Sequence, residues 1–344
     1  MPFQTKLDSS QAYTVAWLAA LPHERAAATM MLDERHQQPQ DFVKNANDPN
    51  SYTWGQVGSH NVVIASLPAG EYGLTSTAVT AQGLLSSLPH IRIGLLVGIG
   101  AGIPGEIHDA DGTVRADRDI RLGDIVVSNP DGTNGGVVQY DLIKAKQSFE
   151  RKGFLNSPPQ ALRSALAAIQ AEHELEDSKI PEFMEESVKR YPKVAATYSR
   201  PAADTDRLFR ASYHHSGGET CNGCSEAEQV IRPLRENSVI HYGTIASGNT
   251  LVKDAMYRDE VLSWLRRENI RPLCFEMEAA GLMNAFPCMV IRGICDYGDS
   301  HKNDEWQRYA AAAAAAFAKE LLGFVDVQEV QHAPELSKVL KNSL

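Results

Sequence analysis

The sequence has neither an excess of basic residues nor a long hydrophobic run, and each absence excludes a class of protein. Lys and Arg number 33 against 43 Asp and Glu, giving a formal net charge of −10. No basic stretch interleaved with aromatics suggests a nucleic-acid-binding groove. The longest apolar run near the start, Tyr13 to Leu21, is too short to span a bilayer and lacks the positive region of a signal peptide. We therefore expect neither nucleic acid nor a membrane as a partner.

Cysteine is scarce, and its use indicates a reducing compartment. The chain has 5 cysteines, an odd number. Cys274, Cys288 and Cys295 lie in apolar segments, where a free thiol usually packs as a small hydrophobic side chain. We therefore expect a cytoplasmic protein without a disulfide framework.

The remaining pair, Cys221 and Cys224, leaves three interpretations open. With His214 and His215 upstream it offers the ligand types of a structural zinc site, although two adjacent histidines and a single pair match the usual finger spacing poorly. A disulfide is the second interpretation, and two unpaired thiols are the third. We expect the third, and hence no metal and no cofactor.

What the sequence does contain is the pattern of an α/β protein. At 344 residues and 43% hydrophobic content, the chain is long enough to bury a full core. Short apolar runs alternate with helical patterns, which is typical of a sheet packed by helices. The predicted strands are Val15–Leu21, Asn61–Ser66, Ile93–Val97, Asp124–Ser128, Val239–Ile245 and Met289–Ile294. The predicted helices are Glu24–Leu32, Thr75–Leu88, Gln160–Ala171, Asp259–Glu268, Glu278–Phe286 and Asp304–Phe324, the last containing the alanine run Ala310–Ala316.

Two stretches interrupt this alternation. His108–Asp119 is acidic and rich in turn-forming residues, and we expect a surface excursion there. The stretch from about 149 to 236 is polar and rich in Pro, His and charged residues, which predicts an inserted lobe. We place one domain at residues 11–327, including this insertion, followed by a polar C-terminal tail at 328–344 that we expect to be frayed.

Two segments place carboxylates in apolar surroundings, an arrangement that is unfavourable unless the carboxylates have partners. Glu276 and Glu278 lie where a helix is expected to begin; favourable interaction with the helix dipole is the alternative explanation. Asp296 ends an apolar strand, a place where α/β proteins bind ligands. Capping of the following turn is the alternative there.

Six segments, in this order, resemble the nucleoside phosphorylase superfamily, especially methylthioadenosine/S-adenosylhomocysteine nucleosidases and their fungal relatives. The resemblance runs from about Tyr13 to Leu322. It implies a single α/β domain with a central mixed sheet flanked by helices, an enzyme of purine nucleoside metabolism and a homo-oligomer. The six segments are Ala19–Glu24, Val97–Gly102, Gly123–Ser128, Ala246–Asn249, Phe275–Ala279 and Arg292–Asp296.

The resemblance also implies a role for each of three carboxylates. Asp296 matches the group that donates a proton or hydrogen bond to purine N7, which helps a poor leaving group to depart. Glu278 matches the carboxylate that holds the 2′- and 3′-hydroxyls and stabilises positive charge on the sugar. Glu24 matches the residue that orients and deprotonates the attacking water.

Other positions carry over as substrate contacts. Leu251 and Val252 match residues that face the base, and Met277 should lie beneath the ribose or base. The resemblance also places Gly100, Ala101, Asn249 and Glu276 in the binding site, and it implies that the turn Gly70–Gly73 lines the pocket.

The same comparison favours water over phosphate as the nucleophile. Phosphorylases of this fold bind phosphate with an arginine and a serine at the glycine-rich turn, where this chain has Val97 and Gly100. Glu24 near the first strand repels an anion, although Arg25 beside it keeps phosphorolysis open. The expected activity is a purine nucleosidase that prefers adenosine. The alternatives are an ATP N-glycosidase of defence type, which would need cations such as Arg25, Arg115, Arg118, Arg121 or Arg200, a phosphorylase, and a non-catalytic nucleoside sensor.

Overall fold

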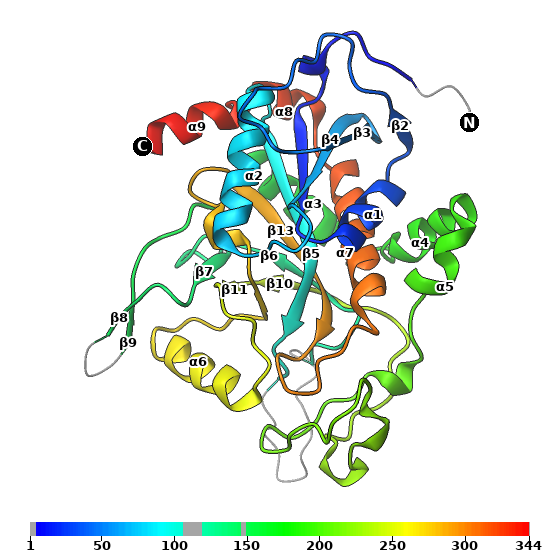
Figure 1. The fold of residues 1–344 in the computed structure, drawn as a ribbon, viewed down its shortest axis with the longest axis vertical. Helices are drawn as coiled ribbons and strands as arrows, with labels where there is room; N and C mark the ends of the chain where they lie inside the picture. Colours follow the sequence, from blue (N-terminus) through cyan, green and yellow to red (C-terminus); the bar gives the residue numbers. More distant parts are fainter. Residues whose placement is uncertain (1–4, 106–118, 146–148, 344) are drawn as a thin grey trace.

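A mixed β-sheet runs through the computed structural model, which describes residues 5–105, 119–145 and 149–343 (Figure 1). The excursion expected at His108–Asp119 lies outside these ranges except for its last residue. Within them an 11-stranded sheet has the principal order β10-β6-β13-β5-β1-β4-β3-β2, with β12 and then β11 and β7 branching from β5. Both parallel and antiparallel neighbours occur, so the predicted α/β fold with a central mixed sheet is confirmed.

The strands of this sheet are β1 (Val15–Ala19), β2 (Glu34–His36), β3 (Tyr52–Val57), β4 (His60–Ser66), β5 (Ile93–Gly102), β6 (Ile125–Ser128), β7 (Val137–Gln139), β10 (Ile240–Gly243), β11 (Ile245–Ser247), β12 (Cys274–Glu276) and β13 (Cys288–Asp296). A separate two-stranded sheet pairs β8 (Ile143–Ala145) with β9 (Phe149–Arg151). The helices are α1 (Pro22–Met30), α2 (Leu74–Ser87), α3 (Gln160–Glu172), α4 (Ile180–Arg190), α5 (Ala195–Tyr198), α6 (Ala255–Arg267), α7 (Gln307–Gly323), α8 (Val327–His332) and α9 (Leu336–Ser343). No helix in the described ranges has the length and apolar character needed to cross a bilayer.

The alternation of side chains along β1 divides the core between the two faces of the sheet. Val15 and Trp17 belong to the cluster that includes residues of α1, α3 and α7. Ala16 and Leu18 belong to the opposite cluster, which includes residues of α2. Because helices cover both faces, the central strands are buried and read as continuous apolar runs.

The alanine run allows α7 to lie unusually close to the sheet. All seven residues of Ala310–Ala316 are buried. Gly293 on β13 faces this helix, and a Cβ atom there would lie only 1.9 Å from the carbonyl oxygen of Ala310. The small residues therefore let the main chains of α7 and β13 touch, and the expected packed helix is confirmed in its place.

Several predicted elements differ from the structure, among them the helix predicted at Asp259–Glu268, which begins at Ala255. Residues Val239–Ile245 form two short strands, β10 and β11, and the strand predicted at Ile93–Val97 continues to Gly102. The helix predicted at Glu278–Phe286 is wrong, because a short 3₁₀ turn, Ala279–Gly281, is followed by irregular turns. The turn packs main chain to main chain against the start of α2, since a Cβ on Gly281 would lie 2.2 Å from the carbonyl oxygen of Leu74. This tertiary contact takes the place of the local helical pattern.

The insertion and the tail both contribute to the core. Within the insertion, Leu162 and Ile169 of α3 are fully buried in the cluster that contains α7, whereas residues 200–236 contain only short 3₁₀ turns as helical structure. The tail is not frayed as expected, because α8 and α9 form and lie beside the end of α2 (Figure 1). Buried Val330 and Leu336 anchor these two helices.

Candidate active site

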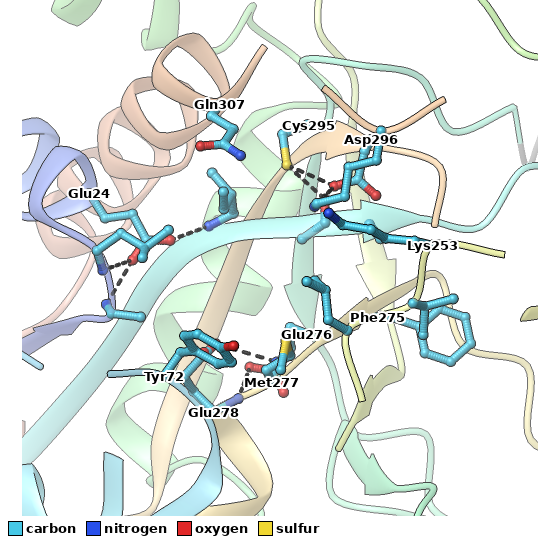
Figure 2. Close-up of a pocket in the computed structure, with 18 of the residues that line it drawn as sticks. Glu24, Tyr72, Lys253, Phe275, Glu276, Met277, Glu278, Cys295, Asp296 and Gln307 are labelled. Atoms are coloured by element: carbon cyan, nitrogen blue, oxygen red, sulfur yellow. Dashed lines mark hydrogen bonds and ion pairs between the residues drawn. The ribbon is translucent and has the colours of Figure 1, made fainter. Parts of the chain in front are cut away.

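One cavity of about 300 Å³ collects the predicted site residues. Its walls come from the start of α1, the end of β5, β12, the loop after β11 and the end of β13. Figure 2 shows Glu24 on one side, Tyr72 with Met277 and Glu278 on another, and Asp296 with Cys295 on a third. Of the predicted residues, Glu24, Gly100, Ala101, Leu251, Val252, Glu276, Met277, Glu278 and Asp296 line the cavity.

Asn249 is the predicted contact that does not line this cavity. Its side-chain oxygen accepts a hydrogen bond from Leu74 N at 3.1 Å, at the start of α2. Its own backbone N–H donates to Asp141 Oδ2 at 2.7 Å. Asn249 therefore fastens the loop after β11 to neighbouring elements.

Glu24 is held rigidly at the start of α1. Its Oε2 accepts hydrogen bonds from Ala20 N at 2.7 Å and Leu21 N at 2.9 Å, and its Oε1 accepts from Ile99 N at 2.8 Å. The side chain thereby satisfies backbone donors at the helix N-terminus and joins β1 to β5. Its carboxylate is also presented to the cavity in one fixed orientation.

Gly98 on β5 makes room for two charged side chains. A Cβ at this position would lie 2.3 Å from Glu24 Oε1 and 2.6 Å from Arg292 Nη1. The Glu24 carboxylate and the Arg292 guanidinium therefore occupy the space that a side chain at position 98 would fill, so only glycine fits here. Arg292 Nη1 also donates to the carbonyl oxygen of Ile99 at 3.4 Å.

Arg292 joins two carboxylates beneath the cavity floor. It lies in the middle of β13 with none of its surface exposed. Its Nη2 donates to Glu278 Oε2 at 3.1 Å and forms a close ion pair with Glu276. Glu276 in turn accepts hydrogen bonds from the backbone N–H groups of Glu278 and Ala279, at 3.1 Å and 3.0 Å. Glu276 therefore shapes the turn that presents Glu278.

The protonation of Glu278 is poised near neutrality. Burial is the largest cause and raises the pKa of Glu278, the positive charge of Arg292 opposes this, and the negative charges of Glu276 and Glu24 raise it further. The resulting pKa is about 7. A buried carboxyl whose charge changes near neutral pH is typical of a functional site.

Asp296 both caps a turn and faces the cavity, so the two sequence interpretations are compatible. The register of β13 shifts between Ile294 and Asp296, where the strand leaves regular pairing with β5. Asp296 Oδ1 accepts from Gly298 N at 2.8 Å. The other oxygen forms a close ion pair with Lys302, which also lines the cavity.

The arginines that would support phosphate binding are placed elsewhere. Arg25 donates to the hydroxyls of Ser51, Ser66 and Thr53 and does not line the cavity. Arg121 pairs with Asp119, and Arg200 stacks on Trp306 and Tyr309. Arg115 and Arg118 lie outside the described residues. Among the described residues, the basic side chains that line the cavity are exposed Lys253 and the paired Lys302.

The remaining walls offer apolar and aromatic surface. Leu251 and Val252 lie in the loop after β11, Phe275 lies in β12, and Met277 directly follows β12. Tyr72 from the predicted Gly70–Gly73 turn also lines the cavity and is 59% exposed. The Tyr72 ring provides a flat surface of the kind that binds a heterocyclic base, whereas the Phe275 ring packs against Tyr140 in the core.

Three site residues were assigned no role from the sequence. Arg292 and Gly98 lay inside recognised segments, and an arginine within an apolar strand is itself a signal, because a buried charge requires a partner. Lys302 lies in a polar loop, where no sequence signal separates it from an ordinary surface lysine.

Comparison with known proteins finds curated relatives of two kinds. A "Nucleotide-binding leucine-rich repeat (NLR)-like protein" of Hyaloscypha variabilis is 41% identical over 327 residues, covering 93% of this chain and 30% of that protein. The "ATP nucleosidase Cap17" of Escherichia coli is 34% identical over 89 residues, covering 24% of this chain and 17% of that protein. The chain thus spans less than a third of the length of either relative. No protein-family model matches the sequence.

Solved structures match over nearly the whole chain. Futalosine hydrolase of Helicobacter pylori has a TM-score of 0.53 at 14% identity, covering 92% of this chain and 99% of that one. The 5′-methylthioadenosine/S-adenosylhomocysteine nucleosidase of Neisseria meningitidis, in complex with methylthio-immucillin-A, has the same TM-score of 0.53 and 14% identity, covering 90% of this chain and 97% of that one. The chain therefore has the nucleoside phosphorylase/nucleosidase fold that its sequence motifs predicted.

Proposed function

We propose that this protein hydrolyses the N-glycosidic bond of purine ribonucleosides, with adenosine as the preferred substrate, to give free base and ribose. The observation that carries this proposal is the convergence of Glu24, Glu278 and Asp296 on one cavity. Its structural neighbours of known activity are nucleosidases, and the relative Cap17 is an ATP nucleosidase.

Departure of the base is assisted by Asp296 and Lys302. In the ion pair, the lysine ammonium holds a proton beside the carboxylate oxygen. This pair can deliver one proton to purine N7 as the bond from N9 to C1′ breaks, so the base leaves as a neutral molecule. The same carboxylate can accept a hydrogen bond from a 6-amino group, which is the reason to favour adenosine.

Stabilisation of the sugar falls to Glu278. A carboxylate that binds the ribose hydroxyls positions the sugar and counters the positive charge that develops at C1′. Arg292 favours the ionised form of Glu278, and Glu276 and Glu24 favour the protonated form. The sugar hydroxyls would then bind to a carboxyl whose charge depends on its burial and on Arg292, Glu276 and Glu24.

Water is the proposed nucleophile, activated by Glu24. The three backbone donors fix this carboxylate, and it can accept a proton as water adds to C1′. Arg25 is occupied by three hydroxyls away from the cavity, and no arginine among the described residues lines it. This arrangement supports hydrolysis over phosphorolysis.

Product analysis tests the proposal. The protein is incubated with adenosine, inosine, methylthioadenosine and uridine, with and without inorganic phosphate, and the sugar and base are separated by chromatography. We expect free ribose and adenine from adenosine in either buffer, with purine nucleosides cleaved much faster than uridine. Ribose 1-phosphate formed only when phosphate is present would replace hydrolysis by phosphorolysis, and preferential uridine cleavage would remove the N7 role.

A second candidate substrate is ATP, which the similarity to Cap17 and the exposed Lys253 on the cavity wall favour. A triphosphate would require a cation at the 5′ side of the sugar. Of the two lysines that line the cavity within the described residues, Lys302 is paired with Asp296, so Lys253 is the one that could bind the phosphates. ATP would then release adenine and ribose 5-triphosphate. A Lys253→Met variant should lose activity on ATP and keep activity on adenosine if this candidate is right; equal effects on both substrates would argue against it.

Two expectations about the whole protein remain proposals. We propose that the protein is cytoplasmic, because its cysteine usage is that of a reducing compartment. We also propose that it forms a homo-oligomer, as the family resemblance implies. Light scattering coupled to gel filtration measures the assembly directly, and a mass equal to one chain at micromolar concentration would contradict it.

A further inference from the structure

Four sulfur- and nitrogen-bearing side chains meet beyond the Asp296 end of β13, where the insertion contacts the loop from β13 to α7. His215, Cys221 and Cys224 come from the insertion, and His301 comes from the loop. Ring nitrogens of the two histidines and the sulfur of Cys224 all lie within 4.8 Å of one another. Cys221 Sγ lies 4.0 Å from His215 Nδ1.

The two cysteines share one tight turn. The backbone N–H of Cys224 donates to the carbonyl oxygen of Cys221 at 3.0 Å, closing the 3₁₀ turn Cys221–Gly223. Two thiols separated by two residues on such a turn are the usual half of a structural zinc site. Ser216 Oγ lies 3.7 Å from the sulfur of Cys224, so a hydroxyl is in place to donate to a thiolate.

His215 is oriented with one nitrogen toward the sulfurs. Its Nε2 lies 3.1 Å from the carbonyl oxygen of Gly218 and, as a donor there, leaves Nδ1 as the acceptor. Nδ1 lies 3.2 Å from Cys224 Sγ. A histidine that ligates a metal commonly donates its other N–H to a carbonyl or a carboxylate in this way.

His301 is the buried group that lacks an ordinary partner. Its side chain is 5% exposed, yet neither ring nitrogen makes a hydrogen bond within the described residues. The ring stacks on Phe209, with 4.1 Å between centroids and 17° between planes. Asp299 Oδ1 lies 3.7 Å from Nδ1. A buried imidazole without a hydrogen bond is unfavourable unless another partner satisfies it.

We propose that Cys221, Cys224, His215 and His301 bind one zinc ion. Two sulfurs and two imidazole nitrogens are a donor set that selects zinc with tetrahedral geometry. Bond lengths of about 2.3 Å to sulfur and about 2.0 Å to nitrogen place neighbouring ligand atoms roughly 3.3–3.8 Å apart. The separations of 3.2 Å and 4.0 Å between His215 Nδ1 and the two sulfurs are close to this range. Cys221 lies outside the tighter group of His215, Cys224 and His301, so its side chain would have to move toward the ion.

The ion would be structural, because four protein ligands leave no position for substrate or water. It would clamp the insertion onto the loop that follows Asp296. His215 N already donates to Ser300 Oγ at 2.9 Å in the same contact. Lys302 comes directly after the ligand His301 and forms the ion pair with Asp296. The metal would therefore fix the loop that carries the Asp296 partner.

Metal analysis of the full chain provides the test, and it is independent of any enzymatic activity. Protein purified without chelator should contain about one zinc ion per chain. His215→Gln, His301→Gln and Cys224→Ser variants should each lose most of it. His214→Gln is the matched control, because His214 is the exposed neighbour of His215 and makes no part of the cluster; it should retain zinc.

A second measurement avoids variants that fail to fold. Replacing zinc by Co²⁺ in the unsubstituted protein should produce the intense visible bands of a tetrahedral site and near-ultraviolet bands from thiolate ligands. Absence of zinc in the purified protein together with absence of these bands would overturn the proposal. So would equal zinc loss in the His214 and His215 variants, or a mass lower by two hydrogens that reveals a Cys221–Cys224 disulfide.

Discussion

Removal of the buried arginine is the sharpest test of how this site is held together. Replacing Arg292 by Met keeps much of the side-chain volume and removes the charge that faces Glu276 and Glu278. Both carboxylates are then left in a site where Glu276 has no exposed side-chain surface and Glu278 has 8%. We expect a large loss in the free energy of unfolding.

The magnitude follows from charge separation and burial. At 3.1 Å between Arg292 Nη2 and Glu278 Oε2, one pair is worth about 5 kcal/mol at an effective dielectric constant of about 20. Glu278 can escape part of this cost by binding a proton, because its pKa is already about 7. The loss at neutral pH should therefore be roughly 3–5 kcal/mol, as for other buried pairs that lose one member.

Urea unfolding followed by circular dichroism measures the effect. Burial raises the pKa of Glu278, and removing the positive charge of Arg292, which lowers it, should raise it further. Stability is therefore lost as pH rises through the folded pKa of Glu278 and returns as pH falls. The deficit should shrink between about pH 8 and about pH 5. Adding Glu276→Gln should recover more than about 1 kcal/mol. Arg258→Met is the matched control, because Arg258 is also buried but its carboxylate partner Asp259 is exposed.

Two outcomes would refute this reasoning. A loss of less than about 1 kcal/mol in the Arg292→Met variant would show that the carboxylates do not depend on the arginine. A loss as large for Arg258→Met, unchanged between the two pH values, would show that any buried arginine has the same effect.

Further predictions concern catalysis. Asp296→Asn should lower turnover by about 10²–10⁴-fold with less effect on binding, measured by adenine release, and a parental rate would contradict its role. Glu24→Gln should reduce turnover while nucleoside binding by calorimetry stays nearly intact; weakened binding at a normal rate would point elsewhere. If binding requires ionised Glu278, kcat/KM should fall as pH drops below about 7. Glu276→Gln removes a negative neighbour of Glu278 and should therefore shift this acidic fall of kcat/KM to lower pH. An unshifted fall would exclude Glu278 as its source. Gly98→Ala, whose Cβ would lie 2.3 Å from Glu24 Oε1, should impair turnover more than thermal stability, and a fully active variant would show that Glu24 can shift freely.

The sequence was sufficient for elements whose pattern is local. Strand β4 and helices α2 and α3 were predicted to within one or two residues. Each is long enough for its apolar residues to show the repeat of a strand or a helix. Three-residue strands such as β2 and β12 have too few residues to show a period, and their pairing depends on distant neighbours. The predicted helix after Glu278 failed for the same reason, since a contact with α2 decides that conformation.

The site shows the same division between local and distant causes. Glu278 and Asp296 were recognisable because an acidic residue inside an apolar segment needs a partner. The identity of those partners was not recognisable: Arg292 meets Glu278 only when β12 and β13 lie on either side of β5. His301 joins the cysteines of the insertion across eighty residues, which no local spacing rule can reveal.

The contact between Gly293 and Ala310 sets a limit on how this cavity can vary. Asp296 lies three residues beyond this contact on β13, and Gln307 lies three residues before it on α7. Both residues line the cavity, so the main-chain contact between β13 and α7 fixes the positions of both. Side-chain contacts can repack after a substitution, but two touching backbones cannot move closer or admit a larger residue. Variation in substrate choice should therefore arise on the exposed side of the cavity, at Leu251 and Lys253. The side formed by Asp296 and Gln307 should stay fixed by the contact between the two main chains.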